Sequence, residues 1–220
     1  MTPKHEASDS AIRRLPRYYR LLQEMERSDK TLTSSRELGQ RLGLTASQIR
    51  QDLSGFSCYG QQGSGYVVSE LRENLERVMG LPRPLPAILV GAGSLGKVVS
   101  ENVSFEQRGF SLIGIFDIKP ELLKKQLAGQ TILPMEQLKS FCEMNHPVAA
   151  VLCLPKESAQ AVAQQLVSYG IQGIWNFSHC DISVPGAQVV TVHLDDSLMT
   201  LSYKMHHRRC DCDKKNGYRG

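Results

Sequence analysis

The 220-residue chain is predicted to be an α/β protein in which a helical N-terminal domain precedes a doubly wound parallel sheet. Over about the first 80 residues, apolar side chains recur at helical spacing, whereas after residue 85 short apolar runs alternate with helical segments. Between the two patterns, residues 80–86 contain three prolines in five positions, which disfavours regular structure. We therefore expect a boundary that divides residues 1–84 from residues 85–193.

The N-terminal domain is expected to begin with a helix, because apolar side chains recur at helical spacing over residues 12–25. A second helix should span residues 36–42. Ser34 is its expected N-cap, and Glu37 lies three residues later, as in a capping box. Gly43 follows as a left-handed C-cap. These signals predict where this short helix begins and where it ends.

A third helix should start at Thr45 or at Ser47, so that two short helices joined by a tight turn form a helix-turn-helix. The glycine-rich stretch 55–65 predicts a β-hairpin wing, which residues 66–68 complete. A further helix is expected over residues 70–79. The N-terminal domain is thus predicted to be a winged helix-turn-helix.

The C-terminal domain shows the alternation of strands and helices that is typical of a Rossmann-like parallel sheet. Its first strand is a wholly apolar run, as expected for a strand buried on both faces. The expected strands are 87–90, 111–116, 131–133, 148–154, 173–177 and 188–192, and the expected helices are 95–103, 134–144, 156–169 and a last one at about 195–205.

The net charge of +4 is unevenly distributed. Residues 1–84 carry 13 Lys and Arg against 10 Asp and Glu, residues 85–203 carry 7 against 10, and residues 204–220 carry 6 against 2. Arginines 13, 14, 17 and 20 lie within eight residues with no acid among them. This block predicts a polyanionic partner at the N-terminal end, although a solvated helix face has the same composition.

Composition excludes several classes of protein. No stretch approaches the roughly 20 apolar residues that span a bilayer, and residues 1–10 lack the apolar core of a secretory signal. The six cysteines do not form the pattern of a disulfide framework. We therefore expect a cytoplasmic protein with reduced cysteines and no membrane partner.

A glycine-rich motif follows the first strand of the second domain and opens a helix. The first glycine permits a tight turn, the second a close approach of the backbone to a pyrophosphate, and the third close packing of helix on strand. Asp117 ends the next strand, where a carboxylate accepts hydrogen bonds from the adenosine ribose. The motif is Gly91-Ala92-Gly93-Ser94-Leu95-Gly96.

This combination predicts a site for NAD or NADH. The acid disfavours the 2′-phosphate of NADP(H), and Lys119, two residues later, weakens that preference slightly. The alternative is a structural glycine turn with Asp117 as a capping residue.

Catalysis is poorly supported by the sequence. The candidate proton donors are His146, His179 and His193, of which His179 follows a strand end where ligands bind. A polar loop residue is the commoner role for it. Only about 80 residues separate the dinucleotide unit from the last helix, which leaves no substrate domain. An NAD-dependent oxidoreductase remains the alternative to a regulator, and a DNA-binding scaffold that no longer binds nucleotide is the third possibility.

Several segments match one family in order and spacing over roughly residues 11–205. They are IRRLPRYYR (12–20), SRELG (35–39), LTASQIRQDLS (44–54), GQQGSGY (60–66), GAGSLG (91–96), FD (116–117), LP (154–155) and IWNF (174–177). With these segments the chain resembles the Rex family of redox-sensing transcriptional repressors.

The resemblance implies a homodimer whose C-terminal helix, here 194–206, is exchanged with the partner subunit. It further implies that the dimer binds double-stranded DNA at an inverted-repeat operator with NAD⁺ bound and is released by NADH. The cofactor residues would be 91–96, Asp117, Pro155, Asn176 and Phe177. The DNA-contacting residues would be Arg14, Ser35, Thr45, Ser47, Gln48, Arg50, Gln51, Gln62 and Gly63, from the recognition helix 45–54, the wing 60–66 and the neighbouring helices.

This sequence departs from the family pattern at the DNA face, where Gln51 and Gln62 replace a usual lysine and arginine. We therefore expect an altered operator preference and a smaller phosphate contribution to binding. Because glutamine pairs bidentately with adenine, Gln51 is expected to favour an altered base in each half-site.

The coupling residues that the resemblance implies also depart from the pattern. Arg20 fits the expected arginine, but Asn102 stands in place of a tyrosine. His193 stands in place of an aspartate unless a small gap brings in Asp195.

The C-terminal helix carries one apolar stripe at spacings of four, three and four, at residues 194, 198, 201 and 205. Such a stripe equally suits a helix packed within its own subunit, and the resemblance favours exchange. Beyond it, His206, His207, Cys210 and Cys212 are metal-type ligands. They lack a second spaced pair and lie among basic residues. We expect residues 207–220 to be a disordered basic tail without a metal site.

Overall fold

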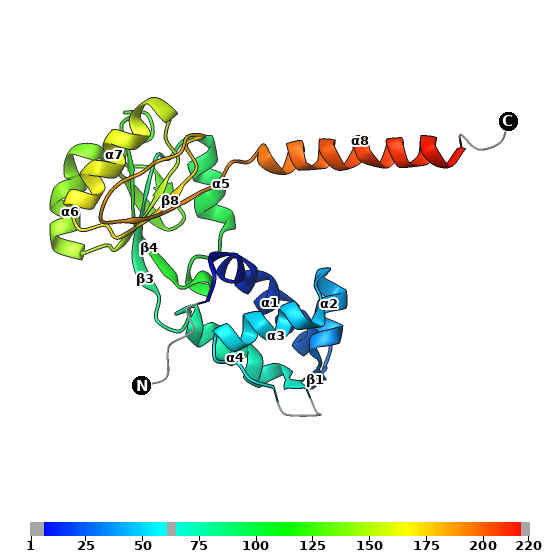
Figure 1. Ribbon diagram of the computed structural model, residues 1–220. Coiled ribbons are helices and arrows are strands. Elements are labelled where there is room, and N and C mark those ends of the chain that lie inside the picture. Colours follow the sequence, from blue (N-terminus) through cyan, green and yellow to red (C-terminus); the bar gives the residue numbers. More distant parts are fainter. Residues whose placement is uncertain (1–6, 61–64, 217–220) are drawn as a thin grey trace. The chain divides into compact units, whose positions relative to one another are not determined.

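The computed structural model describes the backbone of residues 7–60 and 65–216, and side chains within those ranges as far as His207. The chain forms two compact units (Figure 1). The first comprises residues 1–84 with 107–109, and the second comprises residues 85–106 and 110–220.

The first unit is a bundle of four helices around one apolar core. Its buried side chains come from every helix and include Tyr18, Leu38, Ile49 and Leu75. Their helical spacing is what the sequence pattern predicted. The helices are α1 (Asp9–Arg27), α2 (Ser35–Leu42), α3 (Ala46–Gly55) and α4 (Val68–Val78), and the strands are β1 (Leu32–Thr33) and β2 (Tyr66–Val67).

The helix ends follow the predicted capping signals. The Ser34 hydroxyl accepts a hydrogen bond from the Glu37 N–H at 3.2 Å, and Gly43 is left-handed with φ +70°. Thr45, rather than Ser47, caps α3, since its hydroxyl accepts a hydrogen bond from the Gln48 N–H at 3.1 Å. The two helices therefore meet at a short turn, as a helix-turn-helix requires.

The side chain of Glu37 does not complete the predicted capping box. It forms an ion pair with Lys30 and accepts a hydrogen bond from the Thr33 hydroxyl at 3.1 Å. A nearby ammonium is a stronger partner for a carboxylate than the backbone N–H of the cap. These contacts hold the pKa of Glu37 below its ordinary value, with the hydrogen bond from Lys30 as the largest cause.

The predicted hairpin is paired differently from the expectation. Strand β2 pairs with β1, more than 30 residues earlier, with Leu32 opposite Val67 and Thr33 opposite Tyr66. A strand of two residues has no periodicity to detect, and the pairing joins distant segments. The sequence pattern therefore missed β1. The predicted wing residues Gln62 and Gly63 lie outside the described residues.

The second unit contains a sheet in the order β5-β6-β4-β3-β7-β8-β9. Every neighbouring pair is parallel except β5 and β6. The chain moves outward in both directions from β3, so the predicted doubly wound sheet is confirmed. The strands are β3 (Leu85–Val90), β4 (Phe110–Asp117), β5 (Gln126–Leu127), β6 (Gln130–Pro134), β7 (Ala149–Leu152), β8 (Gly173–Asn176) and β9 (Gln188–Thr191).

Helices cover both faces of this sheet (Figure 1). Ile88 and Val90 of β3 belong to a core with α6 and α7, whereas Leu89 between them belongs to a second core with α5. Alternate residues of one strand thus face opposite layers, which explains the unbroken apolar run. The helices are α5 (Ser94–Asn102), α6 (Leu138–Asn145) and α7 (Lys156–Ser168), with short 3₁₀ turns η1 (Glu106–Arg108) and η2 (Met135–Gln137).

The last helix, α8 (Asp196–Asn216), is longer than predicted. Its backbone is helical over most of the segment 207–220 that the sequence analysis expected to be disordered. The chain contains neither glycine nor proline from Asp195 to Asn216, so nothing in it stops the helix before Gly217. Within the described ranges, no helix combines the length and apolar character that crossing a membrane requires.

Candidate functional sites

The glycine-rich loop lies at the carboxyl edge of the sheet, beside β4 and β7. The Gly91 N–H donates to the Phe116 carbonyl at 2.8 Å, and the Cys153 N–H donates to the Val90 carbonyl at 2.9 Å. These two backbone hydrogen bonds join the carboxyl ends of β3, β4 and β7. The chain winds in opposite directions on either side of β3, and this is where open α/β sheets bind ligands.

The three glycines of the loop are required for different reasons. Gly91 has φ +100°, and a Cβ there would lie 2.3 Å from the Cys153 carbonyl oxygen. A Cβ on Gly96 would lie 1.8 Å from the Gly91 carbonyl oxygen. The fold itself therefore demands both. Gly93 has an ordinary φ of −66°, and no heavy atom of the described residues lies within 4 Å of its ideal Cβ.

Gly93 is the N-cap of α5, so its open side lies beside the first turn of that helix. The N–H groups of this turn, including those of Ser94 and Leu95, have no partner within an α-helix. Ser94 is exposed. A helix N-terminus with unpaired donors and no side chain in front of it suits the two phosphates of a dinucleotide. The residues present therefore fit such a group.

Asp117 is only 6% exposed and fastens the glycine loop. One carboxylate oxygen accepts from the Ala92 N–H at 2.6 Å, and the other accepts from the Lys119 N–H at 2.8 Å. The structure therefore gives Asp117 the capping role that the sequence analysis held as the alternative. Each oxygen retains a second lone pair, so a ribose hydroxyl still has an acceptor here.

Asn176, an expected cofactor residue, is fully buried at 0% exposure. Its amide nitrogen donates to the Cys180 carbonyl at 2.7 Å and to the Thr191 hydroxyl at 3.3 Å. Its amide oxygen accepts from the N–H and the hydroxyl of Ser178. Those four bonds use its full capacity. In this structure Asn176 holds the turn after β8 and offers no surface to a ligand.

The other two expected nicotinamide-side residues differ in exposure. Pro155 is exposed as the N-cap of α7. Phe177 is buried, with its ring edge-on to Trp175 at a centroid distance of 4.6 Å. Burial also raises the pKa of the neighbouring Cys153 thiol to about 12, so this thiol is uncharged near neutral pH.

In the helical unit, Asp52 is the centre of a buried polar cluster. Its carboxylate accepts two hydrogen bonds from the Arg14 guanidinium, at 2.6 and 2.8 Å, and one from the Tyr18 hydroxyl at 2.5 Å. Gln48 donates to it at 2.8 Å. Burial opposes ionisation, but these hydrogen bonds hold the pKa of Asp52 below its ordinary value. The cluster ties α1 to α3.

Arg14 and Gln48, which were both expected to contact DNA, form hydrogen bonds with Asp52 in the structure. The role of Asp52 was not among the predictions, although one signal for it is present in the sequence. Asp52 lies on the inner side of an amphipathic helix, between Ile49 and Leu53, where an acid needs a partner.

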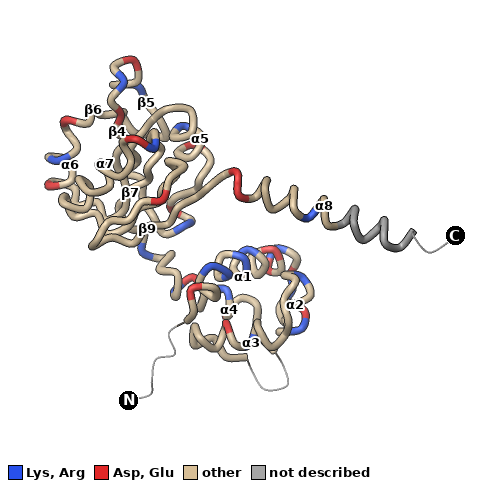
Figure 2. Tube along the Cα trace, turned by 45° about the horizontal axis from the view of Figure 1, so that its top comes forward, with Lys and Arg blue, Asp and Glu red and all other residues tan. Residues whose placement is uncertain are grey.

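Four of the other expected DNA contacts that the structure describes lie at the surface. Thr45, Ser47, Arg50 and Gln51 are exposed, and the Arg50 guanidinium donates to the half-buried Ser35 hydroxyl at 3.1 Å. On α1, arginines 13, 17 and 20 are exposed as well, and the tube in Figure 2 marks Lys and Arg positions along this helix, with Asp and Glu positions among them. The exposed polar face of α3 and the basic residues of α1 suit a nucleic-acid partner.

The expected coupling residues are each engaged locally or exposed. Asn102 bonds within α5, donating to the Val98 carbonyl at 2.9 Å, and Arg20 is exposed on α1. His193 lies 3.3 Å from the Asp181 carboxylate, a partner that the sequence analysis did not identify. Asp195 opens α8, and its carbonyl accepts from the first turn of that helix.

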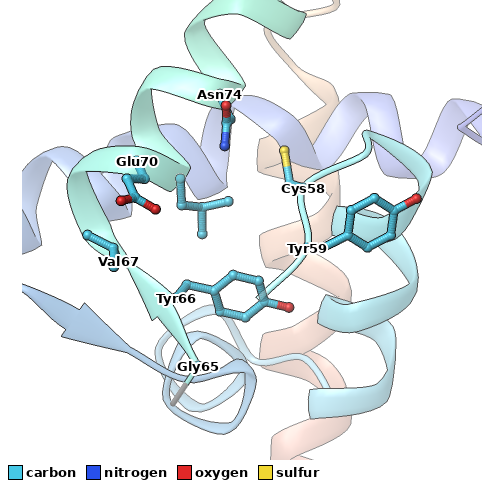
Figure 3. Close-up of a pocket in the computed structure, with 8 residues that line it drawn as sticks. Cys58, Tyr59, Gly65, Tyr66, Val67, Glu70 and Asn74 are labelled. Atoms are coloured by element: carbon cyan, nitrogen blue, oxygen red, sulfur yellow. The ribbon is translucent and has the colours of Figure 1, made fainter. Parts of the chain in front are cut away.

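A cavity of about 30 Å³ lies between the start of α4 and the segment after α3 (Figure 3). It has room for about one water molecule, far less than a small-molecule site needs. The residues that line it are Cys58, Tyr59, Gly65, Tyr66, Val67, Glu70, Leu71 and Asn74.

His206 and His207 are exposed on α8, each bonded to a carbonyl one turn earlier. The side chains of Cys210 and Cys212 lie outside the described residues.

Comparison with known families divides the chain as the fold does. Residues 6–54 match a family described as a putative DNA-binding protein N-terminus. Residues 83–180 match the CoA binding domain family.

Whole-length relatives are more specific. The chain is 45% identical to the redox-sensing transcriptional repressor Rex of Caldanaerobacter subterraneus subsp. tengcongensis, over 94% of this chain and 92% of that one. It is 42% identical to the Rex repressor of Clostridium perfringens strain SM101, over 94% and 98%.

Two solved structures of RSP, a Rex-family repressor, superpose on it with a TM-score of 0.86 and 42% identity. One contains β-NADH, with 94% of this chain and 98% of that chain covered. The other contains β-NAD⁺ and operator DNA, with 97% and 99% covered. The chain belongs to the Rex family of redox-sensing transcriptional repressors.

Proposed function

We propose that this protein represses transcription by binding an inverted-repeat operator as a dimer, and that it leaves the operator when NADH replaces NAD⁺. The observation that carries the proposal is the open face of Gly93 in a chain that also holds a helix-turn-helix. A glycine that the fold itself does not need is explained by a ligand that approaches the backbone there. RSP, solved with each form of the dinucleotide, supports the same function.

The proposed cofactor residues lie on three neighbouring loops. The loop 91–96 and the start of α5 would hold the pyrophosphate, and Asp117 would orient the loop and accept from the ribose. Pro155 and the turn held by Asn176 would border the nicotinamide. When bound, the dinucleotide supplies a ligand whose charge differs by one between its two forms.

The dimer is proposed to form through α8. Four apolar side chains on this helix or just before it, which the sequence pattern places on one stripe, are 51–66% exposed: Leu194, Leu198, Leu201 and Met205. In Figure 1 the helix covers neither face of the sheet of its own unit. Exposure of an apolar stripe to water is unfavourable, and a second copy of the chain can cover it with a matching surface. We accordingly assign residues 1–84 to DNA binding, 85–193 to the dinucleotide and 194–206 to exchange between subunits.

We also propose that the protein is not an enzyme and that it acts in the cytoplasm, where the genome and the dinucleotide pool are found. The relatives are named as repressors, which supports a regulatory role.

The test is a gel-shift titration of an inverted-repeat operator with the full-length protein. Bound DNA should persist in NAD⁺ and be released as NADH is added. By linkage, operator DNA should weaken NADH binding by the same factor. Equal operator affinity in the two forms of the dinucleotide would reject the proposal.

A further inference from the structure

Two arginines of α1 reach the two helices of the helix-turn-helix. The Arg14 guanidinium donates to both carboxylate oxygens of Asp52 on α3, at 2.6 and 2.8 Å. Three residues further along α1, Arg17 donates to the Leu42 carbonyl at the end of α2, at 2.8 Å. A cation at a helix C-terminus is also favoured by the helix dipole. Side chains of α1 therefore hold both helices of the motif.

The contact with α3 is directional. This helix packs through Ile49 and Leu53, both 0% exposed, but apolar contacts have no preferred angle. Two parallel hydrogen bonds between a guanidinium and a carboxylate do have one, because both donors must meet both oxygens. The Tyr18 hydroxyl donates to the same carboxylate at 2.5 Å. Asp52 is thus held from two positions one turn apart on α1, and the rotation of α3 about its axis is fixed with it.

The same contacts keep Arg14 from serving as a DNA contact. Its side chain is 19% exposed, and the donors that would match a phosphate are already bonded to Asp52. The Asp52 side chain is 2% exposed. If the guanidinium turned to a phosphate, this buried carboxylate would lose its counter-charge, which is strongly unfavourable. Tyr18, at 1% exposure, cannot reach DNA either.

We propose that Arg14 is a positioning residue for operator binding, which sets the orientation of α3 through Asp52 and does not contact the DNA. This assignment rests on the proposed function, because it requires α3 to dock on the operator. A helix that samples several orientations binds with an affinity reduced by the fraction that is correctly oriented. Loss of one charge-assisted hydrogen bond of the cluster should therefore weaken operator binding by roughly tenfold.

The test compares two variants of the full-length protein, each saturated with NAD⁺. Arg14→Lys keeps the positive charge but cannot form the bidentate pair. Tyr18→Phe removes the other α1 donor to Asp52 and leaves the charge unchanged. Dissociation constants are measured for an inverted-repeat operator and for a random duplex of the same length. Thermal melts give the stability of each variant, so that binding is compared between folded proteins.

The chain offers a matched control for each variant. Arg13→Lys makes the same change at the neighbouring position, where the side chain is exposed. Tyr19→Phe removes a hydroxyl from the next residue, which is also buried. The Tyr19 hydroxyl likewise donates to a carboxylate, but this one belongs to Glu76 on α4, at 2.7 Å. The two tyrosine variants therefore differ in which helix loses its hydrogen bond.

Arg14→Lys and Tyr18→Phe should bind the operator roughly tenfold more weakly and the random duplex as wild type does, because phosphate contacts supply nonspecific affinity. Both controls should keep the wild-type ratio of the two affinities. A residue that serves stability alone would lower the melting temperature and leave the affinity of the folded protein unchanged.

Three results would overturn the assignment. The first is wild-type operator affinity in Arg14→Lys, since lysine can replace arginine at a phosphate contact but not in a bidentate pair. The second is an equal loss on operator and random duplex, which indicates a phosphate contact. The third is equal operator affinity in Tyr18→Phe and Tyr19→Phe. If wild type binds both duplexes equally, the proposed function fails first, and this assignment fails with it.

Discussion

Replacing Gly93 by valine separates the requirements of the fold from those of the ligand. The backbone at this position has φ −66° and ψ −167°, which valine adopts readily, and the ideal Cβ meets no described heavy atom within 4 Å. Valine is a poorer N-cap than glycine by ~0.5–1 kcal/mol. It also reduces the freedom of the unfolded chain, which stabilises by ~0.4–1 kcal/mol. The two effects nearly cancel.

The effect on NADH should be much larger. A branched side chain in front of the first turn of α5 would keep the pyrophosphate from reaching its N–H groups. Losing two charge-assisted hydrogen bonds of ~1.5–3 kcal/mol each gives ~3–6 kcal/mol, or about 10²- to 10⁴-fold in Kd. We therefore expect Gly93→Val to melt within about 3 °C of wild type and to bind NADH too weakly for calorimetry to detect.

Gly96→Val is the matched control, because its Cβ would lie 1.8 Å from the Gly91 carbonyl oxygen. It should lower the melting temperature as well as the affinity, since backbone must move to admit it. Calorimetry and thermal melts of both variants give the comparison. A folded Gly93→Val protein with wild-type NADH affinity would refute the assignment of the loop.

The remaining predictions concern the helical unit and α8. Asp52→Asn should destabilise the helical unit by about 3 kcal/mol because it leaves Arg14 without its counter-charge, and hydrogen exchange of α1 and α3 amides should rise. Since the folded pKa of Asp52 is lowered, its stabilisation should be full above the ordinary value of 3.8 and be lost as pH falls through the folded value. Exchange measured across that range should show no such step in Asp52→Asn. Arg50→Ala should reduce discrimination by ~1–3 kcal/mol per half-site in binding to single-base operator variants, and equal losses on all variants would indicate a phosphate contact instead. Truncation before Leu194 should give a monomer or weak dimer whose DNA binding does not respond to NADH. A truncated protein that sediments as a tight dimer and is still released from the operator by NADH would exclude α8 as the coupling element.

Local signals in the sequence determined much of this protein. Helix ends are defined by the backbone and hydroxyl groups of Ser34, Gly43 and Thr45. The helix-turn-helix can therefore be recognised from the sequence alone. The glycine motif and the apolar runs likewise act over a few residues. The alternation of strand and helix, together with the right-handed crossover of parallel strands, then leaves few sheet orders to choose from.

Tertiary structure decided what each polar side chain is free to do. The sequence treats Arg14, Gln48 and Asn176 as available for a ligand, and the fold engages all three with other groups of the chain. The partner of Arg14, Asp52, lies 38 residues along the chain. The pairing of β1 with β2 is of the same kind. A hydrogen bond depends on distance in space, whereas a sequence pattern records only spacing along the chain. The same residue type stands at Gly91, Gly93 and Gly96. Only the atoms around these glycines show that the fold requires two of them and that the third leaves space for a ligand.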